Sequence, residues 1–490
     1  MASEHRQGWF GLPWFGVKPQ EEVVSCVLSG GGSRASFQIG ALEYLYRHDP
    51  LFTPTVFVGT SAGSILAAGL SQYAKRADQL AWVHRIDDVW SAMTSSDDMF
   101  TPRRWFAKLQ TDGPSWLDLV TPKPPEPPKA PAKPLLPFLR PETPLPLSPD
   151  TPTDPWEWAL SPDKELRAEW SLETLSSLMG GLRQLPRIGT DLNAIWHGAE
   201  RSRSLYQPGP VLKRLLEPET FDPEKVASSG MTLRLAMVAL ESGELRFMTE
   251  TGELVDRDNR PIGTKADLLT TGVLASCAIP AVFRPVPIGD EHYVDGGARE
   301  NLPAELAIGH LGASRNYVVS SQTIGLERGR SMATADLFSI VMRSTEILID
   351  EAGRDELAYA YSAGAVVIHP EISVHSSMTV HPGLIQINRD YGWMRAAERV
   401  LGLGAAERER HAAITRHRVE CVQWEERYAI DPTPEALAEV GRRKRDLRQL
   451  VTGSTTGALP PHADSWWTGF EAHPDPIDAQ PFWIPTRHAL

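Results

Sequence analysis

Hydrophobic positions at the start of the chain switch twice between unbroken runs and helical spacing. A mostly apolar run at residues 23–28 has the length and composition of a buried strand. Apolar residues at helical spacing follow over residues 35–46, and the Asp-Pro pair at 49–50 ends that pattern. A second short strand at 56–58 precedes another helical run over 65–70. This order predicts an α/β fold with a parallel sheet and right-handed crossovers.

Further strands and helices are predicted along the rest of the chain. Strand-like apolar runs lie at residues 233–239, 317–320 and 365–368. Helical spacing covers residues 335–360, and charged helical sequence follows residue 404. The alternation of strands with helices therefore extends the predicted α/β arrangement well beyond the first four elements.

The chain divides on these patterns into three parts. Residues 1–21 form an aromatic N-terminal segment, residues 22–403 one catalytic domain, and residues 404–490 a helical extension with an irregular tail. A proline-dominated tract runs from residue 114 to 155 and belongs to an insertion at about 114–200. Since motifs on both sides of it are needed for one site, we interpret it as an insertion, or a lid with its tether. A solvated spacer is the more common role of such a tract, and binding of a protein partner is the alternative.

Composition narrows the classes of function. The 490-residue chain is 41% hydrophobic and 23% charged, and its formal net charge of −13 argues against nucleic-acid binding. Three widely spaced cysteines predict neither a disulfide framework nor a zinc site, and favour reduced thiols in the cytoplasm. No apolar run is long enough to predict a spanning helix, and the N-terminus lacks the pattern of a signal peptide. Peripheral attachment to a membrane stays compatible with this composition, because apolar patches can dock an acidic protein.

The segment G-T-S-A-G at residues 59–63 has the pattern of a nucleophile turn. It lies where the second predicted strand must turn abruptly into a helix, and the small residues around Ser61 permit that turn. The hydroxyl of Ser61 is then exposed at the carboxyl end of the strand, against a helix N-terminus whose field favours developing negative charge. Gly59 and Gly63 support the turn. A glycine-serine turn without chemistry is the alternative for this motif alone.

A glycine loop, Gly30-Gly31-Gly32, followed by Ser33 and Arg34, also joins a strand to a helix. As a dinucleotide fingerprint it would require an acidic residue at the end of the next strand, where the chain has the Ser61 turn instead. We therefore interpret the loop as an oxyanion hole, because glycines leave backbone N–H groups free to point at a tetrahedral intermediate. The positive charge of Arg34 either adds to the stabilisation of the oxyanion or forms a surface ion pair.

Two further motifs follow much later in the sequence. Asp295-Gly296-Gly297 comes directly after a short strand-like pair, so its carboxylate lies at the edge between strand and loop. Alone, this motif is more typical of a turn than of catalysis. The segment A-S-C-A-I-P at residues 275–280 ends a helical stretch and turns toward Asp295, and alone it indicates a helix end closed by proline.

The ordered combination of these four motifs resembles the patatin-like phospholipase family. The resemblance covers residues 23–303, includes Asn301 and Pro303, and continues to about residue 368. It implies a three-layer α/β/α fold with a mainly parallel central sheet, to which the proline-rich insertion and helical extension are added. The residue after Arg34 is Ala35, where the family usually has glycine, so we expect an altered fit of the loop with activity retained.

By the same resemblance, Ser61 is the nucleophile and Asp295 the general base of a catalytic dyad. Gly30, Gly31, Gly32 and Arg34 match the oxyanion-hole motif, and Gly59, Gly63, Gly296 and Gly297 support the two catalytic positions. The implied activity is hydrolysis of fatty-acyl esters in glycerolipids through an acyl-enzyme, on lipid presented at a membrane or micelle surface. No metal or cofactor is implied. Protein partners and oligomeric state stay open.

Two alternatives to this interpretation remain at the sequence level. An α/β-hydrolase with a Ser-His-Asp triad is available in the order Ser61, Asp295, His369, although its nucleophile usually lies much further into the domain. The other alternative is a catalytically silent scaffold that binds lipid or a protein partner. The joint presence of nucleophile, base and anion hole argues against it, because loss of any one of them would silence the site.

Overall fold

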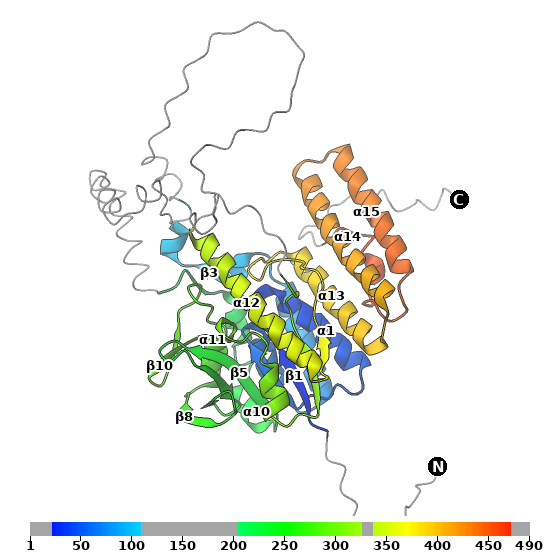
Figure 1. The fold of residues 1–490 in the computed structure, drawn as a ribbon. Helices are drawn as coiled ribbons and strands as arrows, with labels where there is room; N and C mark the ends of the chain where they lie inside the picture. Colours follow the sequence, from blue (N-terminus) through cyan, green and yellow to red (C-terminus); the bar gives the residue numbers. More distant parts are fainter. Residues whose placement is uncertain (1–21, 109–110, 112–202, 326–336, 472–490) are drawn as a thin grey trace, which may run out of the picture. The chain divides into compact units, whose positions relative to one another are not determined.

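The computed structural model describes residues 22–108, 111, 203–325 and 337–471 (Figure 1). The chain forms two compact units, residues 1–102 with 203–490, and residues 103–202. The aromatic N-terminal segment and the predicted proline-rich insertion lie outside the described residues. All elements discussed below belong to the first unit. No helix in the described part of the chain is long and apolar enough to cross a membrane.

The first unit is built on a ten-stranded sheet with a parallel centre. The parallel strands follow one another in the order β12 (Val366–Ile368), β11 (Arg315–Val319), β1 (Val24–Leu28), β2 (Val56–Thr60) and β5 (Thr232–Ala239). These strands correspond to the apolar runs in the sequence, because strands buried on both faces need nearly continuous apolar residues.

Antiparallel strands extend the sheet beyond β5. On one edge of β5 follow β6 (Leu245–Thr249), β7 (Glu253–Val255) and β8 (Pro261–Lys265). On the other edge β5 also pairs with β10 (Glu291–Asp295), whose second neighbour is β9 (Val286–Ile288). The parallel centre was predicted, and the antiparallel extension was not.

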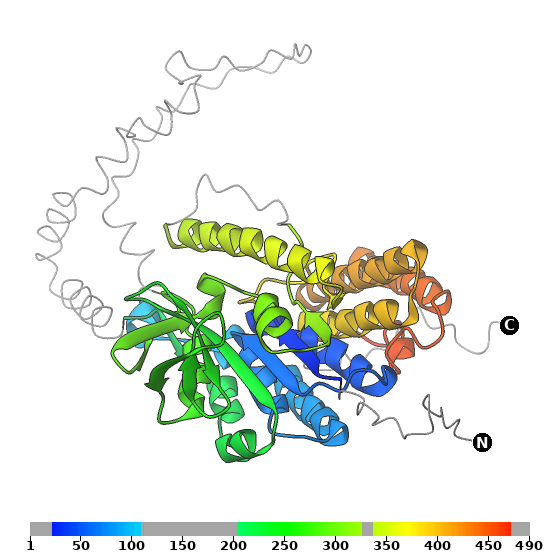
Figure 2. The same ribbon diagram turned by 60° about the horizontal axis from the view of Figure 1, so that its bottom comes forward.

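Helices cover both faces of the sheet and make three layers (Figure 2). Alternate strand residues divide between two apolar clusters, so that Cys26 packs on one face and its neighbour Val27 on the other. The first face is covered by α1 (Ala35–His48), α2 (Ala62–Leu70), α3 (Arg76–Ser91), α11 (Leu269–Ser276) and α13 (Pro382–Leu401). The second face packs against α12 (Leu337–Ser362) and a helical turn at Leu306–His310. This arrangement confirms the expected three-layer fold.

Short elements of the first unit flank residues 103–202 in the sequence. β3 (Phe100–Pro102) pairs antiparallel with β4 (Tyr206–Pro208) in a separate two-stranded ribbon. α9 (Pro210–Leu215) and α10 (Pro223–Ser228) follow, each with a proline in its first turn, where a missing N–H costs nothing.

Two long helices, α14 (Ala405–Ile430) and α15 (Pro434–Thr452), follow α13 and pack on each other. A buried ion pair ties them to the rest of the unit, since Arg418 of α14 lies 2.8 Å from Asp390 of α13. Within the basic run at residues 442–445, Lys444 is buried and lies 2.9 Å from the Glu425 carboxylate, which offsets the cost of removing its charge from water.

Candidate active site

Two strands, β2 and β10, pair with the same edge of β5, one after the other along its length. β2 runs parallel to the first half of β5 and ends with Thr60 opposite Ala236. β10 runs antiparallel to the second half and ends with Asp295 opposite Met237, while β6 occupies the other edge. Since Ala236 and Met237 are consecutive, the ends of β2 and β10 lie one residue apart along β5. This arrangement brings Ser61, the residue after β2, beside Asp295.

Ser61 occupies a strained turn between β2 and α2. Its backbone has φ 53° and ψ −125°, which costs a residue with a Cβ atom about 1–3 kcal/mol. Close packing leaves no room for side chains on either flank. A Cβ atom at Gly59 would lie 2.5 Å from the Gly63 carbonyl oxygen, and one at Gly63 would lie 2.4 Å from the Leu28 carbonyl oxygen. The two flanking glycines therefore let α2 pack directly on the ends of β1 and β2.

Three side chains hold the backbone of Ser61 in this conformation. Its N–H donates to the Ser276 hydroxyl at 3.0 Å. Its carbonyl oxygen accepts from the Ser64 hydroxyl at 2.6 Å and from the Cys277 thiol at 3.2 Å. Ser276 and Cys277 belong to the A-S-C-A-I-P segment. That segment therefore supports the strained turn.

The same segment also holds Asp295. The Asp295 N–H donates to the Ala278 carbonyl oxygen at 3.0 Å, and its carboxylate accepts from the Gly297 N–H at 2.8 Å. Gly296 packs tightly, since a Cβ atom there would lie 2.7 Å from the Ala236 carbonyl oxygen. Asp295 and the turn at Ser61 are thus fixed by three consecutive residues, 276–278.

Asp295 has a strongly perturbed proton affinity. Its side chain is only 5% exposed, and burial raises its pKa to about 6. Hydrogen bonds from the Ser61 side chain and from the Gly297 N–H act in the opposite direction and lower that pKa. A carboxylate with a pKa near 6 is still ionised at neutral pH and is a stronger base than an ordinary aspartate.

The glycine loop lies directly beside Ser61. A Cβ atom at Gly30 would come within 3.1 Å of the Ser61 Cβ atom. The N–H groups of Gly30, Ser33 and Arg34 are engaged, with the carbonyl oxygens of Asn301, Ser377 and Gly31 respectively. Within the described part of the chain, the N–H groups of Gly31 and Gly32 have no acceptor. These two adjacent donors are the ones available to a ligand.

Gly32 and Arg34 differ in their relation to the site. Gly32 has φ 56° and a Cβ atom there would lie 2.4 Å from the Ser377 carbonyl oxygen, so glycine is required. Gly32 also lines the cavity beside Ser61, and Arg34 does not. The positive charge of Arg34 instead acts on His375, whose pKa it lowers in addition to the larger effect of burial.

His369, the third member of the alternative triad, is engaged elsewhere. Its Nδ1 atom lies 3.0 Å from the Pro370 carbonyl oxygen and its Nε2 atom 3.1 Å from the Tyr361 hydroxyl. Burial lowers the pKa of this imidazole. Both ring nitrogens are therefore occupied by partners other than Ser61 and Asp295, and the triad geometry is absent from the described residues.

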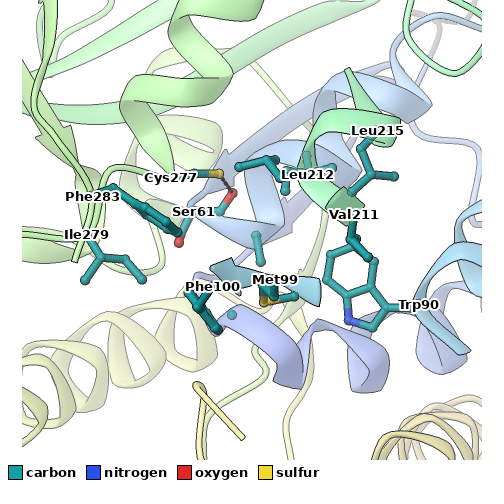
Figure 3. A pocket seen from close by; sticks show the side chains of 13 residues that line it. Ser61, Trp90, Met99, Phe100, Val211, Leu212, Leu215, Cys277, Ile279 and Phe283 are labelled. Carbon is teal, nitrogen blue, oxygen red and sulfur yellow. Dashed lines mark hydrogen bonds between the residues drawn. The ribbon is translucent and has the colours of Figure 1, made fainter. Parts of the chain in front are cut away.

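An apolar cavity opens beside Ser61 (Figure 3). It contains about 420 Å³ of empty space, part of it open solvent. Leu212, Leu215 and Trp90 line it on one side of Ser61, and Phe283 lies on the other side. Except for Ser61 and the Cys277 thiol, the side chains that line it are apolar. Such a wall favours a hydrocarbon chain over a polar ligand.

Trp90 connects the cavity wall with the glycine loop. Its side chain is 1% exposed and its indole N–H donates to the Ser33 carbonyl oxygen at 3.2 Å. The Ser33 hydroxyl in turn lies 2.8 Å from the Thr379 carbonyl oxygen. The loop is thus held from the helix side by α3 and from the other side by the segment before α13.

Several residues of the site were not identified as functional from the sequence. Ser276 and Cys277 lie within the A-S-C-A-I-P motif, but the motif alone does not indicate which residues they contact. Ser321, whose hydroxyl donates to the Gly30 carbonyl oxygen at 2.9 Å, directly follows a predicted strand. A small polar residue at the carboxyl end of a strand could have indicated it, since such ends meet at one edge of a parallel sheet.

No group of three or more histidine, cysteine, aspartate or glutamate side chains in the described residues could hold a metal ion. The groups gathered at the site are a hydroxyl, a buried carboxylate and two backbone donors.

Comparison with known proteins identifies the family. The family model described as Patatin-like phospholipase matches residues 26–308, more than half of the 490-residue chain. No curated protein matches. Among solved structures, VipD from Legionella pneumophila is 14% identical, with 91% of this chain and 83% of that chain covered and a TM-score of 0.31. The heterodimeric ExoU–SpcU complex of the Pseudomonas aeruginosa type III secretion system contains a chain that is 15% identical, with 91% and 75% covered and a TM-score of 0.22.

Proposed function

The chain belongs to the patatin-like phospholipase family, and from the geometry of the site we propose that it hydrolyses fatty-acyl esters of glycerolipids through an acyl-enzyme on Ser61. One observation carries this proposal. A serine in a strained turn lies beside a buried carboxylate whose pKa burial raises to about 6, and the Ser61 side chain acts on that pKa in the opposite direction. Ser-Asp dyad chemistry needs a base of this kind.

Acylation begins with proton transfer from the Ser61 hydroxyl to the Asp295 carboxylate while the serine oxygen attacks the ester carbonyl carbon. Negative charge develops on the former carbonyl oxygen. The unengaged N–H groups of Gly31 and Gly32 stabilise that charge, and each such donor contributes about 10²–10³ in rate. When the intermediate collapses, the alcohol leaves with the proton held by Asp295, and the acyl group remains on Ser61.

Deacylation repeats these steps with water as the nucleophile. Asp295 accepts a proton from water as the water oxygen attacks the acyl carbon, and the same two N–H groups hold the second oxyanion. The proton on Asp295 returns to the serine oxygen as the fatty acid leaves. The Cys277 thiol takes no part in proton transfer, because burial raises its pKa far above neutral pH.

The acyl chain of the substrate is proposed to occupy the apolar cavity. Trp90, Leu212 and Leu215 remove its methylene groups from water, which stabilises the bound acyl chain by about 0.8 kcal/mol for each methylene buried. The headgroup then remains outside the cavity, toward a membrane or micelle surface from which the lipid is taken. This accounts for the choice of a lipid ester over a short polar ester.

The proposal is tested by incubating the protein with mixed phospholipid vesicles and identifying released fatty acids and lysolipids by mass spectrometry. We expect release by the wild type, and loss of at least a thousandfold for Ser61→Ala and Asp295→Asn. Ser228→Ala, at an exposed position outside the site, serves as the control. Equal release by wild type and Ser61→Ala would overturn the proposal.

A fluorophosphonate probe separates the enzyme from a silent scaffold. An activated serine displaces the leaving group of the probe and becomes covalently labelled. We expect one labelled peptide, containing Ser61, in the wild type, and slow labelling in Asp295→Asn. A wild-type protein that binds vesicles but is neither labelled nor active would support the scaffold instead.

A further inference from the structure

Helix α12 presents one carboxylate to the loop that follows Asp295. The two oxygens of Glu356 accept hydrogen bonds from two consecutive backbone N–H groups, those of Asn301 at 3.0 Å and Leu302 at 2.7 Å. Glu356 lies beyond residue 308, where the family match ends. It contacts neither Ser61 nor the cavity wall.

Asn301 connects this carboxylate to the glycine loop. The carbonyl oxygen of Asn301 accepts from the Gly30 N–H at 3.1 Å, and its side-chain amide donates to the Gly30 carbonyl oxygen at 3.5 Å. A Cβ atom at Gly30 would lie only 2.4 Å from the Asn301 Oδ1 atom. Gly30 is therefore bound to Asn301 through both its N–H and its carbonyl group.

The orientation of Gly30 determines the orientation of the first oxyanion donor. The Gly30 carbonyl and the Gly31 N–H belong to one planar trans peptide, so they point in opposite directions. Asn301 and Ser321 hold the carbonyl on their side of the loop. The Gly31 N–H consequently points away from Asn301.

We propose that Glu356 is a positioning residue for the oxyanion hole, acting through the backbone of Asn301 on the Gly30–Gly31 peptide. This inference rests on the proposed hydrolase function. An ionised carboxylate suits the task because it accepts two N–H bonds at once, one on each oxygen. A glutamine retains a single oxygen acceptor, and its NH₂ group faces a backbone donor.

Burial and the charged groups around Glu356 bring its pKa into a range where its protonation can be followed in a pH profile. Burial, followed by the negative charge of Glu300, raises the pKa of Glu356 to about 7, while the N–H groups of Leu302 and Asn301 lower it. Asp355 on the same helix acts in the same direction as Glu300. Arg257 lies 3.6 Å from Glu300 and partly offsets its charge. Protonation of Glu356 near neutral pH therefore mimics the loss of one acceptor.

The test compares Glu356→Gln with Glu351→Gln, an exposed position on the same helix. Steady-state kinetics on a soluble short-chain ester, corrected by fluorophosphonate titration for the fraction of active protein, give kcat and KM separately. We expect Glu356→Gln to lower kcat at least tenfold, with KM within twofold of the wild type, because the donor acts mainly on the transition state. Glu351→Gln should match the wild type in both constants.

The pH profile supplies a readout that a merely structural role would not move. For the wild type, log kcat/KM should fall in two steps. The first, centred near pH 7, has the size of the loss in Glu356→Gln, as Glu356 becomes protonated, and the second has a slope of one below pH 6, as Asp295 becomes protonated. Glu356→Gln should lack the first step and show a single apparent pKa near 6. If Glu356→Gln does not fold, Glu356→Asp decides, because it keeps the charge but withdraws both oxygens and should lower kcat in the same way.

Two outcomes would overturn the inference. One is a kcat for Glu356→Gln, or for Glu356→Asp in its place, within twofold of the wild type. The other is a step near pH 7 that persists unchanged in Glu356→Gln. Neither can be confused with failure of the proposed function, which would leave the wild type inactive and Ser61 unlabelled.

Discussion

The hydroxyl of Ser276 accepts a 3.0 Å hydrogen bond from the backbone N–H of Ser61. Both residues are buried, and the strained turn at Ser61 has no other acceptor for that N–H among the described residues. Alanine at 276 would leave the N–H without a partner, which costs about 1–3 kcal/mol. We expect Ser276→Ala to lower the free energy of unfolding by that amount and to slow labelling of Ser61 by a fluorophosphonate. Exposed Ser228→Ala, as the control, should change stability by less than about 0.5 kcal/mol in urea unfolding.

Removal of the Asp295 charge should stabilise the fold while abolishing activity. Because burial raises the folded-state pKa to about 6, against about 3.9 in the unfolded chain, the folded protein binds this proton more tightly. Ionisation between pH 4 and 6 therefore destabilises the fold, by about 3 kcal/mol at most above pH 6. Asp295→Asn should unfold at higher denaturant than the wild type at pH 8, and the difference should vanish near pH 4. The exposed Asp290→Asn is the control, and equal stability of Asp295→Asn and wild type at pH 8 would contradict the prediction.

Gly63 tests whether α2 must pack directly on the strand ends. A Cβ atom there would meet the carbonyl oxygens of Leu28 and Ser29 at 2.4 and 2.5 Å, and neither is a movable side chain. Gly63→Ala should therefore cost at least about 3 kcal/mol and shift α2 with Ser61, so that residual folded protein has little activity. Gly469→Ala, which meets nothing within 4 Å, should be neutral in thermal unfolding. A Gly63→Ala protein as stable and active as the Gly469 control would be incompatible with this packing.

Leu212 is expected to set the preference for acyl-chain length. In a series of esters, kcat/KM of the wild type should rise about fourfold for each added methylene, equivalent to about 0.8 kcal/mol, until the cavity is filled. Leu212→Phe reduces the space beside Trp90 and should end that rise several methylenes earlier, with little change for an acetyl ester. Leu240→Phe, at an exposed position, controls for the added ring. Identical chain-length profiles for the wild type and Leu212→Phe would rule out this cavity as the acyl site.

His369 distinguishes the dyad from the triad. Since its ring nitrogens are engaged with Pro370 and Tyr361, His369→Ala should leave kcat within about threefold of the wild type. Loss of these buried contacts should still lower the free energy of unfolding by about 1–3 kcal/mol. Kinetics normalised by titration of Ser61 separate the two effects. A fall in kcat of a hundredfold or more would instead favour the triad.

Much of the fold was predictable because its centre is encoded locally. The runs at 23–28 and 56–58 are β1 and β2, and the intervening helical pattern is α1. In the turns after both strands, glycine stands where a Cβ atom would lie within 2.5 Å of neighbouring backbone atoms. Only glycine fits there, and this is why the turns can be recognised in the sequence. At these positions, the glycine that marks a turn in the sequence is also the residue that close packing in the folded protein requires.

The rest of the site could not be predicted, because its determinants are distant in sequence. β6 to β8 are short and carry polar residues among their apolar ones, so no continuous apolar run indicates that they extend the sheet. The contact of Glu356 with Asn301 joins residues 55 positions apart, and a glutamate on a helix usually faces water. The position of Asp295 beside Ser61 was expected from the family resemblance and not from local pattern, because it follows from the pairing of β10 with β5, and pairing partners are not a local property of either strand.

The support of Ser61 by Ser276 has a consequence for the time at which catalysis can begin. The two residues are 215 positions apart, and Asp295 comes later still. During synthesis the emerging chain therefore contains the nucleophile long before it contains the groups that hold its strained backbone. A chain released before residue 295 lacks the proposed base and cannot assemble the site, whatever it has folded. The proposed lipid cleavage can therefore start only after most of the polypeptide has left the ribosome and closed these long-range contacts.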